Sequence, residues 1–221
     1  LGVQRGELGE FLTLLRGARG SIELEGFMSH FANADVQQSP LTVLQLKGYR
    51  EGLAAVREAG FNPRYRHLSN SAGLLSQREV RDGLDLNLVR PGLLLYGIAP
   101  EPWLAGDARL ERVLEWKTGV IHLKTIEAGT AVSYGGVWVA PRRSVIATLP
   151  IGYADGFSRV YSDRASVLVR GARAKVVGRV TTDMCLVDVT DVPGVTLGDE
   201  VVILGAQGNE RIAAEELARL S

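Results

Sequence analysis

The texture of the sequence changes near residue 110, and this change constrains the fold more than any other feature. Before it, apolar residues at helical spacing alternate with short extended runs; after it, β-branched alternating runs are broken by glycine turns. The first pattern is typical of βαβ units with parallel strands, and the second of an antiparallel barrel or sandwich. We therefore expect an α/β domain over 1–105 and an all-β domain over 106–221, joined within 100–107.

The first domain has room for only part of an α/β barrel. Helical spacing predicts helices over 8–17 and 44–60, each ending at a glycine (Gly17, Gly60), and a further helix opening at Ser71. Extended candidates are 22–29, 65–69 and 86–90. A closed eight-stranded barrel takes roughly 250 residues, so these three strands predict a partial TIM-type (β/α) barrel.

The second domain is predicted to be antiparallel throughout, with one terminal helix. Its candidate strands are 113–126, 144–149, 167–169, 175–180, 186–189 and 200–204, and the helix is 213–220. Short strands at such spacing, separated by turn residues, favour a sandwich or barrel.

Charge and cysteine content exclude several classes of function. Lys+Arg and Asp+Glu both number 25, and no segment concentrates one sign, so we expect neither nucleic acid nor a membrane surface as a partner. Apolar runs such as 91–96 are far shorter than the roughly 20 residues that span a bilayer, and no signal-peptide layout is present. Cys185 is the single cysteine, and His30, His67 and His122 lack metal-ligand spacing. We expect a cytoplasmic protein without a metal site.

Polar residues follow each predicted strand of the first domain. His30, Ser71 and Arg90 stand where a barrel delivers side chains to its active-site mouth. His30 could equally be a histidine without catalytic duty, and Ser71 could bind phosphate at a helix start or serve only as a cap. Arg90, at the end of an apolar strand, needs either an acceptor on a ligand or a structural acid as its partner. The turn at Gly92 allows backbone to approach a ligand closely.

Two tyrosines of the second domain lie in glycine-rich segments. Tyr134 and Tyr153 could mark β-turns with an exposed aromatic ring. A phenol, with a pKa of about 10 in water, could also transfer protons if its neighbours favour the ionised form. The residues alone leave both interpretations open.

Six segments in this order resemble alanine racemase, a fold-type III pyridoxal phosphate (PLP) enzyme. They are GFMSHFANAD at 26–35, HLSNSA at 67–72, VRPGLLLYG at 89–97, VSYG at 132–135, PIGYADG at 150–156 and GRVTTD at 178–183. The resemblance implies the later part of a PLP-binding barrel followed by a C-terminal β domain.

The same resemblance implies roles for individual residues. Ser71, with the backbone at Gly92 and Leu93, would hold the PLP phosphate, and Asn70 would also bind the cofactor. His30 would lie near the ring, and Arg90 would donate to the pyridine nitrogen. A further set would serve the substrate: Tyr134 as a proton-transfer group reaching a partner subunit's site, Tyr153 and Thr182 at the substrate, and Asp35, Arg159 and Arg179 along the entrance.

The implied reaction is the interconversion of L- and D-alanine by two bases, in a homodimer that supplies peptidoglycan precursors. The second base would be the lysine that forms the Schiff base, and none of Lys47, Lys117, Lys124 or Lys175 stands in that motif. We therefore expect the chain to be a fragment that is inactive alone.

Three alternatives are considered beside this interpretation. A basic amino-acid decarboxylase shares the architecture but places an acid at the pyridine nitrogen, which Arg90 disfavours. A racemase of broader specificity is suggested by Thr182, where the family usually carries methionine. A non-catalytic module would act only through the association surface of its β domain.

Overall fold

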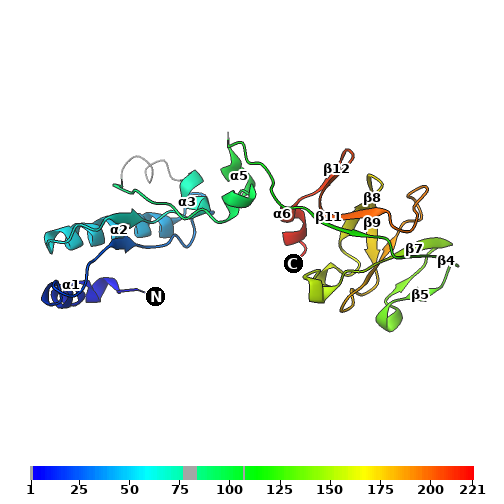
Figure 1. The fold of residues 1–221 in the computed structure, drawn as a ribbon, viewed down its shortest axis with the longest axis horizontal. Helices are drawn as coiled ribbons and strands as arrows, with labels where there is room; N and C mark the ends of the chain where they lie inside the picture. The colour runs from blue at the N-terminus through cyan, green and yellow to red at the C-terminus, as the bar shows by residue number, and fades with distance from the viewer. Residues whose placement is uncertain (1, 77–83, 107) are drawn as a thin grey trace. The chain divides into compact units, whose positions relative to one another are not determined.

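Among the described residues, parallel strand pairing occurs in the first part of the chain and antiparallel pairing in the second (Figure 1). The computed structural model describes residues 2–76, 84–106 and 108–221. They form two compact units, Leu1–Val113 and Leu114–Ser221, called here the α/β unit and the β unit. The chain therefore has the expected fold class, a partial α/β region followed by an antiparallel β domain.

Two helices form the outer layer of the α/β unit. The helix α1 spans Leu8–Gly17, as predicted, and follows a 3-10 turn at Arg5–Glu7. The helix α2 spans Pro40–Glu58 and starts earlier than predicted, because Pro40 occupies the first helical turn, where its fixed φ suits a helix. Beyond α2 the chain turns at Gly60, whose φ of 82° suits glycine.

The sheet of the α/β unit is a parallel pair. Strand β1 (Gly26–Met28) pairs with β2 (Tyr65–His67), with Phe27 opposite Arg66. The ring of Phe27 packs on Tyr49 of α2, with 5.0 Å between centroids. Both predicted strands exist, but each is shorter than the range predicted for it.

The third predicted strand, 86–90, is wrong as a strand. This segment lies beside β2 through two backbone bonds, from the N–H of Asn87 to Arg66 O (3.1 Å) and from the N–H of Arg90 to Ser69 O (3.0 Å). The N–H of Arg66 donates instead to the side-chain Oδ1 of Asn87, at 2.8 Å. A side chain takes the place of a backbone carbonyl, so no regular ladder forms.

Short helices complete the α/β unit. The helix α3 is described over Ser71–Ser76, a 3-10 turn covers Leu93–Tyr96, and α5 spans Pro102–Ala105. The helix α5 lies within the predicted junction, where its four residues give no periodic signal. Residue 107, at the end of that junction, lies outside the described residues.

The β unit is built on one eight-stranded antiparallel sheet. Its path is β12-β11-β8-β9-β10-β7-β4, and β3 pairs with β11. The strands are β3 Trp116–Gly119, β4 His122–Ile126, β7 Ser144–Leu149, β8 Ser166–Val169, β9 Ala172–Val177, β10 Cys185–Asp188, β11 Glu200–Gln207 and β12 Glu210–Ile212.

The predicted strand 113–126 is divided because its two parts pair with different partners. Strand β3 pairs with β11, whereas β4 pairs with β7. Between them Val120 N–H donates to Asp199 O and Ile121 N–H donates to Thr148 O, each at 3.0 Å. The chain thus crosses from one side of the sheet path to the other, and this linkage encloses an apolar core.

The core of the β unit is densely filled. Val167, Leu168 and Val169 of β8 and Val202 and Ile203 of β11 are fully inaccessible. Successive inaccessible residues indicate strands covered on both faces.

Two elements of the β unit were missed by sequence analysis. A ribbon of β5 (Ala131–Val132) and β6 (Trp138–Val139) flanks Tyr134, and β12 is a polar three-residue strand. Two- and three-residue strands are too short for period-two alternation to register.

The terminal helix α6 spans Ala214–Ala218, inside the predicted range. Within the described residues, no helix combines the length and apolar content needed to cross a membrane.

Candidate functional site

The Arg90 guanidinium is the centre of a polar cluster in the α/β unit. Its Nη2 donates to the backbone oxygen of Ser29 at 2.7 Å and lies 3.1 Å from Nδ1 of His30. Its Nη1 contacts Nδ1 of His67. These contacts place Arg90 across the ends of β1 and β2, as the strand-end argument requires.

A structural acid was one of the two partners expected for Arg90. The structure gives it two imidazole nitrogens and a carbonyl oxygen instead. A guanidinium carries five N–H donors. The three contacts given above use Nη1 and Nη2 of Arg90, and the Nε–H takes part in none of them. Arg90 therefore keeps a donor for a further acceptor.

His67 belongs to this cluster, although no role was predicted for it from the sequence. Burial lowers the pKa of His67, and the positive charge of Arg90 lowers it further. A neutral imidazole can accept at Nδ1, which is the atom that Arg90 meets. Its position could have indicated a role, since His67 is the last residue of β2 and the first residue of the HLSNSA segment.

Asn70 ties His30 to the start of α3. Its Nδ2 lies 3.4 Å from Nε2 of His30 and donates to Phe31 O at 3.3 Å, while its Oδ1 accepts the N–H of Gly73 at 2.9 Å. Gly73 must be glycine here, because an added Cβ would lie 2.6 Å from the Phe31 ring. Asn70 thus acts as cap and bridge together.

Ser71 and the turn after Arg90 form a second part of this region. The N–H of Leu94 donates to Oγ of Ser71 at 3.4 Å, and Ser71 is buried. A Cβ added at Gly92 would meet no atom within 4 Å, so the backbone there is open. The contact observed for Ser71 is with Leu94, one residue beyond the predicted Leu93, whose side chain is exposed.

In the β unit, the predicted residues Tyr134, Arg179 and Thr182 line one open pocket of about 580 Å³. The Tyr134 side chain is 71% exposed, so its hydroxyl is accessible from solvent. The other lining residues are Ser133, Thr148, Thr181, Asp183, Met184, Cys185 and Leu186.

Ser133, which precedes Tyr134, has strained backbone. Its φ of 64° and ψ of 177° lie in a region used almost only by glycine. A hydrogen bond from its Oγ to Arg179 O, at 2.8 Å, holds it there. Its Cβ lies close to Gly178, and a Cβ added to that glycine would come within 2.6 Å of it, so the close approach requires glycine at 178. Such strain costs on the order of 1–3 kcal/mol, and it fixes the direction in which Tyr134 leaves the ribbon.

Tyr153 and Thr182 meet beside this pocket. The Tyr153 hydroxyl lies 2.7 Å from Oγ1 of Thr182, and the N–H of Tyr153 donates to Thr181 O at 3.0 Å. A Cβ at Gly152 would lie 2.3 Å from Thr181 O, so only glycine permits this approach. The Arg159 guanidinium lies 5.9 Å from the centroid of the Tyr153 ring.

The predicted residues therefore fall into one set in each unit. The α/β set contains His30, Asn70, Ser71 and Arg90, whereas Asp35 contributes only its backbone oxygen, which accepts from Trp103 Nε1 at 3.1 Å. The β set contains Tyr134, Tyr153, Arg159, Arg179 and Thr182. No three histidine, cysteine or acidic residues lie together as metal ligands within 2–76, 84–106 and 108–221.

The structure joins a parallel α/β unit, with polar residues at the ends of its strands, to an antiparallel β unit, and this is the order of domains that the resemblance to fold-type III enzymes implies. Residues 1–100 match the protein-family profile described as "Alanine racemase, N-terminal domain", and residues 113–221 match "Alanine racemase, C-terminal domain". The chain belongs to the alanine racemase family. This assignment removes the decarboxylase alternative.

Individual relatives agree with these profiles. The chain is 46% identical over 200 residues to alanine racemase of Symbiobacterium thermophilum, covering 90% of this chain and 52% of the relative. It superimposes with a TM-score of 0.88 on the crystal structure of alanine racemase from Bacillus anthracis with bound L-Ala-P (36% identity, 100% and 56% covered). The TM-score is 0.84 for the Bartonella henselae enzyme with covalently bound pyridoxal phosphate (27%, 100% and 57%). The chain spans about half the length of the curated relatives it matches.

Proposed function

We propose that the protein to which this chain belongs interconverts L- and D-alanine with PLP, as a cytoplasmic homodimer. The α/β unit would hold the cofactor, and the β unit would supply one of two proton-transfer groups. The observation that carries the proposal is the Arg90 cluster: a permanently charged donor, held by His30 and His67, with a donor left for a ligand.

The residues present fit the chemical groups of PLP. A phosphate needs hydroxyl and backbone donors, which Ser71 and the open backbone at Gly92 and Leu93 would supply. A pyridine nitrogen needs one donor, which Arg90 has. When bound, PLP supplies the electron sink that stabilises a carbanion at the substrate Cα.

Arg90 would limit that electron sink. Because a guanidinium does not release its proton at ordinary pH, its contact leaves the pyridine nitrogen unprotonated. Carbanion stabilisation is then weaker, which suits reprotonation at Cα and disfavours side reactions such as transamination. A carboxylate at this position would have the opposite effect.

Tyr134 would carry the proton on one face of the substrate. Racemisation needs proton-transfer groups on opposite faces of Cα. The exposed hydroxyl on a strained, fixed turn supports this role, since positioning of such a group within hydrogen-bond reach is the first requirement. Its partner base would be the lysine of the family motif, from the region of the relatives that this chain does not span.

The remaining predicted residues would act on the substrate. Tyr153 would contact the substrate, the backbone at Thr182 would contact its carboxylate, and Asp35, Arg159 and Arg179 would line the entrance. The hydroxyl pair of Tyr153 and Thr182 supports polar contact with the substrate at this place.

A hybrid protein tests this function. The chain is joined to the preceding half of the Symbiobacterium thermophilum relative, loaded with PLP, and assayed with each enantiomer of alanine. We expect racemisation, and loss of it in Arg90→Ala. A folded hybrid that binds PLP without racemising alanine would contradict the proposal and favour a non-catalytic module.

A further inference from the structure

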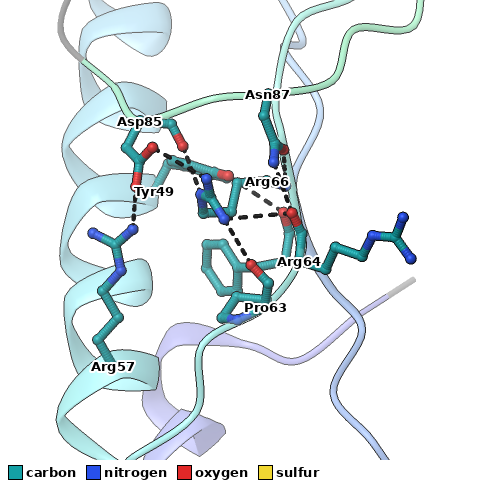
Figure 2. Close-up of polar contacts among 8 residues, drawn as sticks. Tyr49, Arg57, Pro63, Arg64, Arg66, Asp85 and Asn87 are labelled. Atoms are coloured by element: carbon teal, nitrogen blue, oxygen red, sulfur yellow. Dashed lines mark hydrogen bonds and ion pairs between the residues drawn. The ribbon is translucent and has the colours of Figure 1, made fainter.

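The segment that carries Arg90 is attached to the sheet by side chains. Residues 85–90 form no strand, and the described backbone bonds to β2 and its extension are those of Asn87 and Arg90. Figure 2 shows a group of polar side chains at the beginning of this segment, around Arg66 of β2. We call Arg66, Asp85 and Asn87 the clasp.

Arg66 makes the largest number of contacts in the clasp. Its Nε donates to the backbone oxygen of Asp85 and its Nη1 to Pro63 O, both at 2.8 Å, while its Nη2 lies 3.1 Å from Oδ1 of Asp85. The Arg66 side chain is only 15% exposed. Several acceptors in different directions match the planar fork of a guanidinium and cannot be matched by a lysine ammonium.

Asn87 completes the attachment by imitating a strand. Its Oδ1 accepts the N–H of Arg66 at 2.8 Å, its Nδ2 donates to Arg64 O at 2.7 Å, and its own N–H donates to Arg66 O at 3.1 Å. These three bonds fix the register of the segment against β2 at one residue.

Asp85 connects the clasp to α2. Arg57 of that helix forms an ion pair with Asp85, and Figure 2 shows the two side chains facing each other. The hydrogen bond from Arg57 is the main cause that lowers the pKa of the Asp85 carboxyl, and Arg66 adds to it. The carboxylate is therefore ionised at neutral pH and joins the helix, the strand and the segment.

We propose that the clasp positions Arg90 in the cluster with His30 and His67. Arg90 lies three positions after Asn87, and an extended chain advances about 3.3 Å per residue. A slip of one residue would move Arg90 by that amount and turn its side chain to the other face, which would break its contacts with both histidines. Arg66, Asp85 and Asn87 are positioning residues in this account.

The inference rests on the proposed function only for the consequence of moving Arg90. The position of Arg90 against His30 and His67 depends on this chain alone, so it can be tested without PLP and without turnover. Burial lowers the pKa of His67 most, and the nearby charge of Arg90, whose Nη1 contacts the His67 ring, lowers it further. A change in the His67 titration between folded variants therefore reports whether Arg90 is in place.

The test is a proton NMR titration of the three histidines in the 221-residue chain. In the wild type we expect His67 to titrate below 6.5, its value without these neighbours. In Arg66→Lys and in the milder Asn87→Ala we expect its pKa to rise toward that value as Arg90 leaves. The matched control is Arg64→Lys, because the Arg64 side chain points away from the clasp and lies over Tyr65.

Three outcomes would overturn the inference. They are an unchanged His67 titration in both folded clasp variants, an equal rise in Arg64→Lys, and a wild-type His67 that already titrates at its free value. Loss of thermal stability without movement of the His67 pKa would show a merely structural clasp. Failure of the hybrid enzyme to racemise alanine would leave these results standing, so the two proposals fail separately.

Discussion

The two units fix their candidate residues by different means. In the α/β unit, Arg90 is held by side-chain hydrogen bonds that replace a strand ladder. In the β unit, Tyr134 is held by backbone geometry, through the strain at Ser133 and the missing Cβ of Gly178. A side-chain hydrogen bond can be removed by a single substitution, whereas a backbone constraint depends on the whole sheet around it.

The units also differ in how completely they bury their apolar residues. Val201, Val202 and Ile203 of β11 are fully inaccessible, whereas Met28 of β1 is 58% exposed and Leu44 of α2 is 63% exposed. Hydrophobic stabilisation is roughly proportional to the apolar area removed from water. We therefore expect the β unit to be the more stable of the two.

Hydrogen exchange should give the largest contrast. Amides of Leu168 and Val202 in the β unit should exchange orders of magnitude more slowly than those of Phe27 and Arg66, since core strands open only with their whole unit. Exchange is followed by NMR or mass spectrometry on the chain. Equal protection, or slower exchange in β1 and β2, would break the comparison.

Core truncation should destabilise the β unit strongly. Ile203→Ala removes buried methylene groups and leaves a cavity, so we expect a loss of about 2–5 kcal/mol in the free energy of unfolding. The control is Val139→Ala, whose side chain is 51% exposed and should cost much less. Denaturant unfolding monitors both, and similar losses would show that β11 is not the core.

Relief of strain at Ser133 should have a smaller effect. Ser133→Ala and Ser133→Gly both lose the hydrogen bond to Arg179, but only glycine accepts a φ of 64° with a ψ of 177°. The glycine variant should be more stable than the alanine variant by about 1 kcal/mol after its unfolded-state entropy is counted. Thermal unfolding measures the difference, and a more stable alanine variant would argue against strain.

Lowering the pH should destabilise the two units at different pH values, and we expect this to be the smallest of the four effects. The pKa of His67 is lower in the folded chain than in the unfolded chain, so the unfolded state binds more protons as pH falls below 6.5 and the α/β unit loses stability there. In the β unit, the pKa of Asp199 is lowered mainly by the backbone N–H of Thr196, so its contribution is lost only below about 3.8. Unit-specific exchange at pH 7 and pH 5 checks this order, and earlier loss in the β unit would reverse it.

Sequence patterns predicted the elements that local physics decides. The helix over 8–17 and the antiparallel strands of the β unit follow from apolar periodicity and turn residues. The failure at 86–90 has a different kind of cause, because this segment reads as an apolar strand although the Asn87 side chain occupies the ladder position. Pairing of that kind depends on a residue far away in the sequence.

The candidate site was predictable where a motif carries it and hidden where geometry does. Arg90 and Tyr134 stand in recognisable segments, but the contact of His67 with Arg90 and the clasp at Arg66 require the folded chain. The strain at Ser133 is also invisible in sequence, since serine has no preference for the conformation it adopts there.

The role of Tyr134 is tested most directly by proton exchange in the PLP-loaded hybrid enzyme. Tyr134→Phe keeps the ring and removes the hydroxyl, so racemisation should fall by about 10²–10⁴-fold while the fold and PLP binding persist. Exchange of the α-proton with solvent should survive from the enantiomer served by the lysine and fail from the one served by Tyr134. Equal loss from both enantiomers, or near wild-type turnover, would contradict the assignment of Tyr134 as the second base.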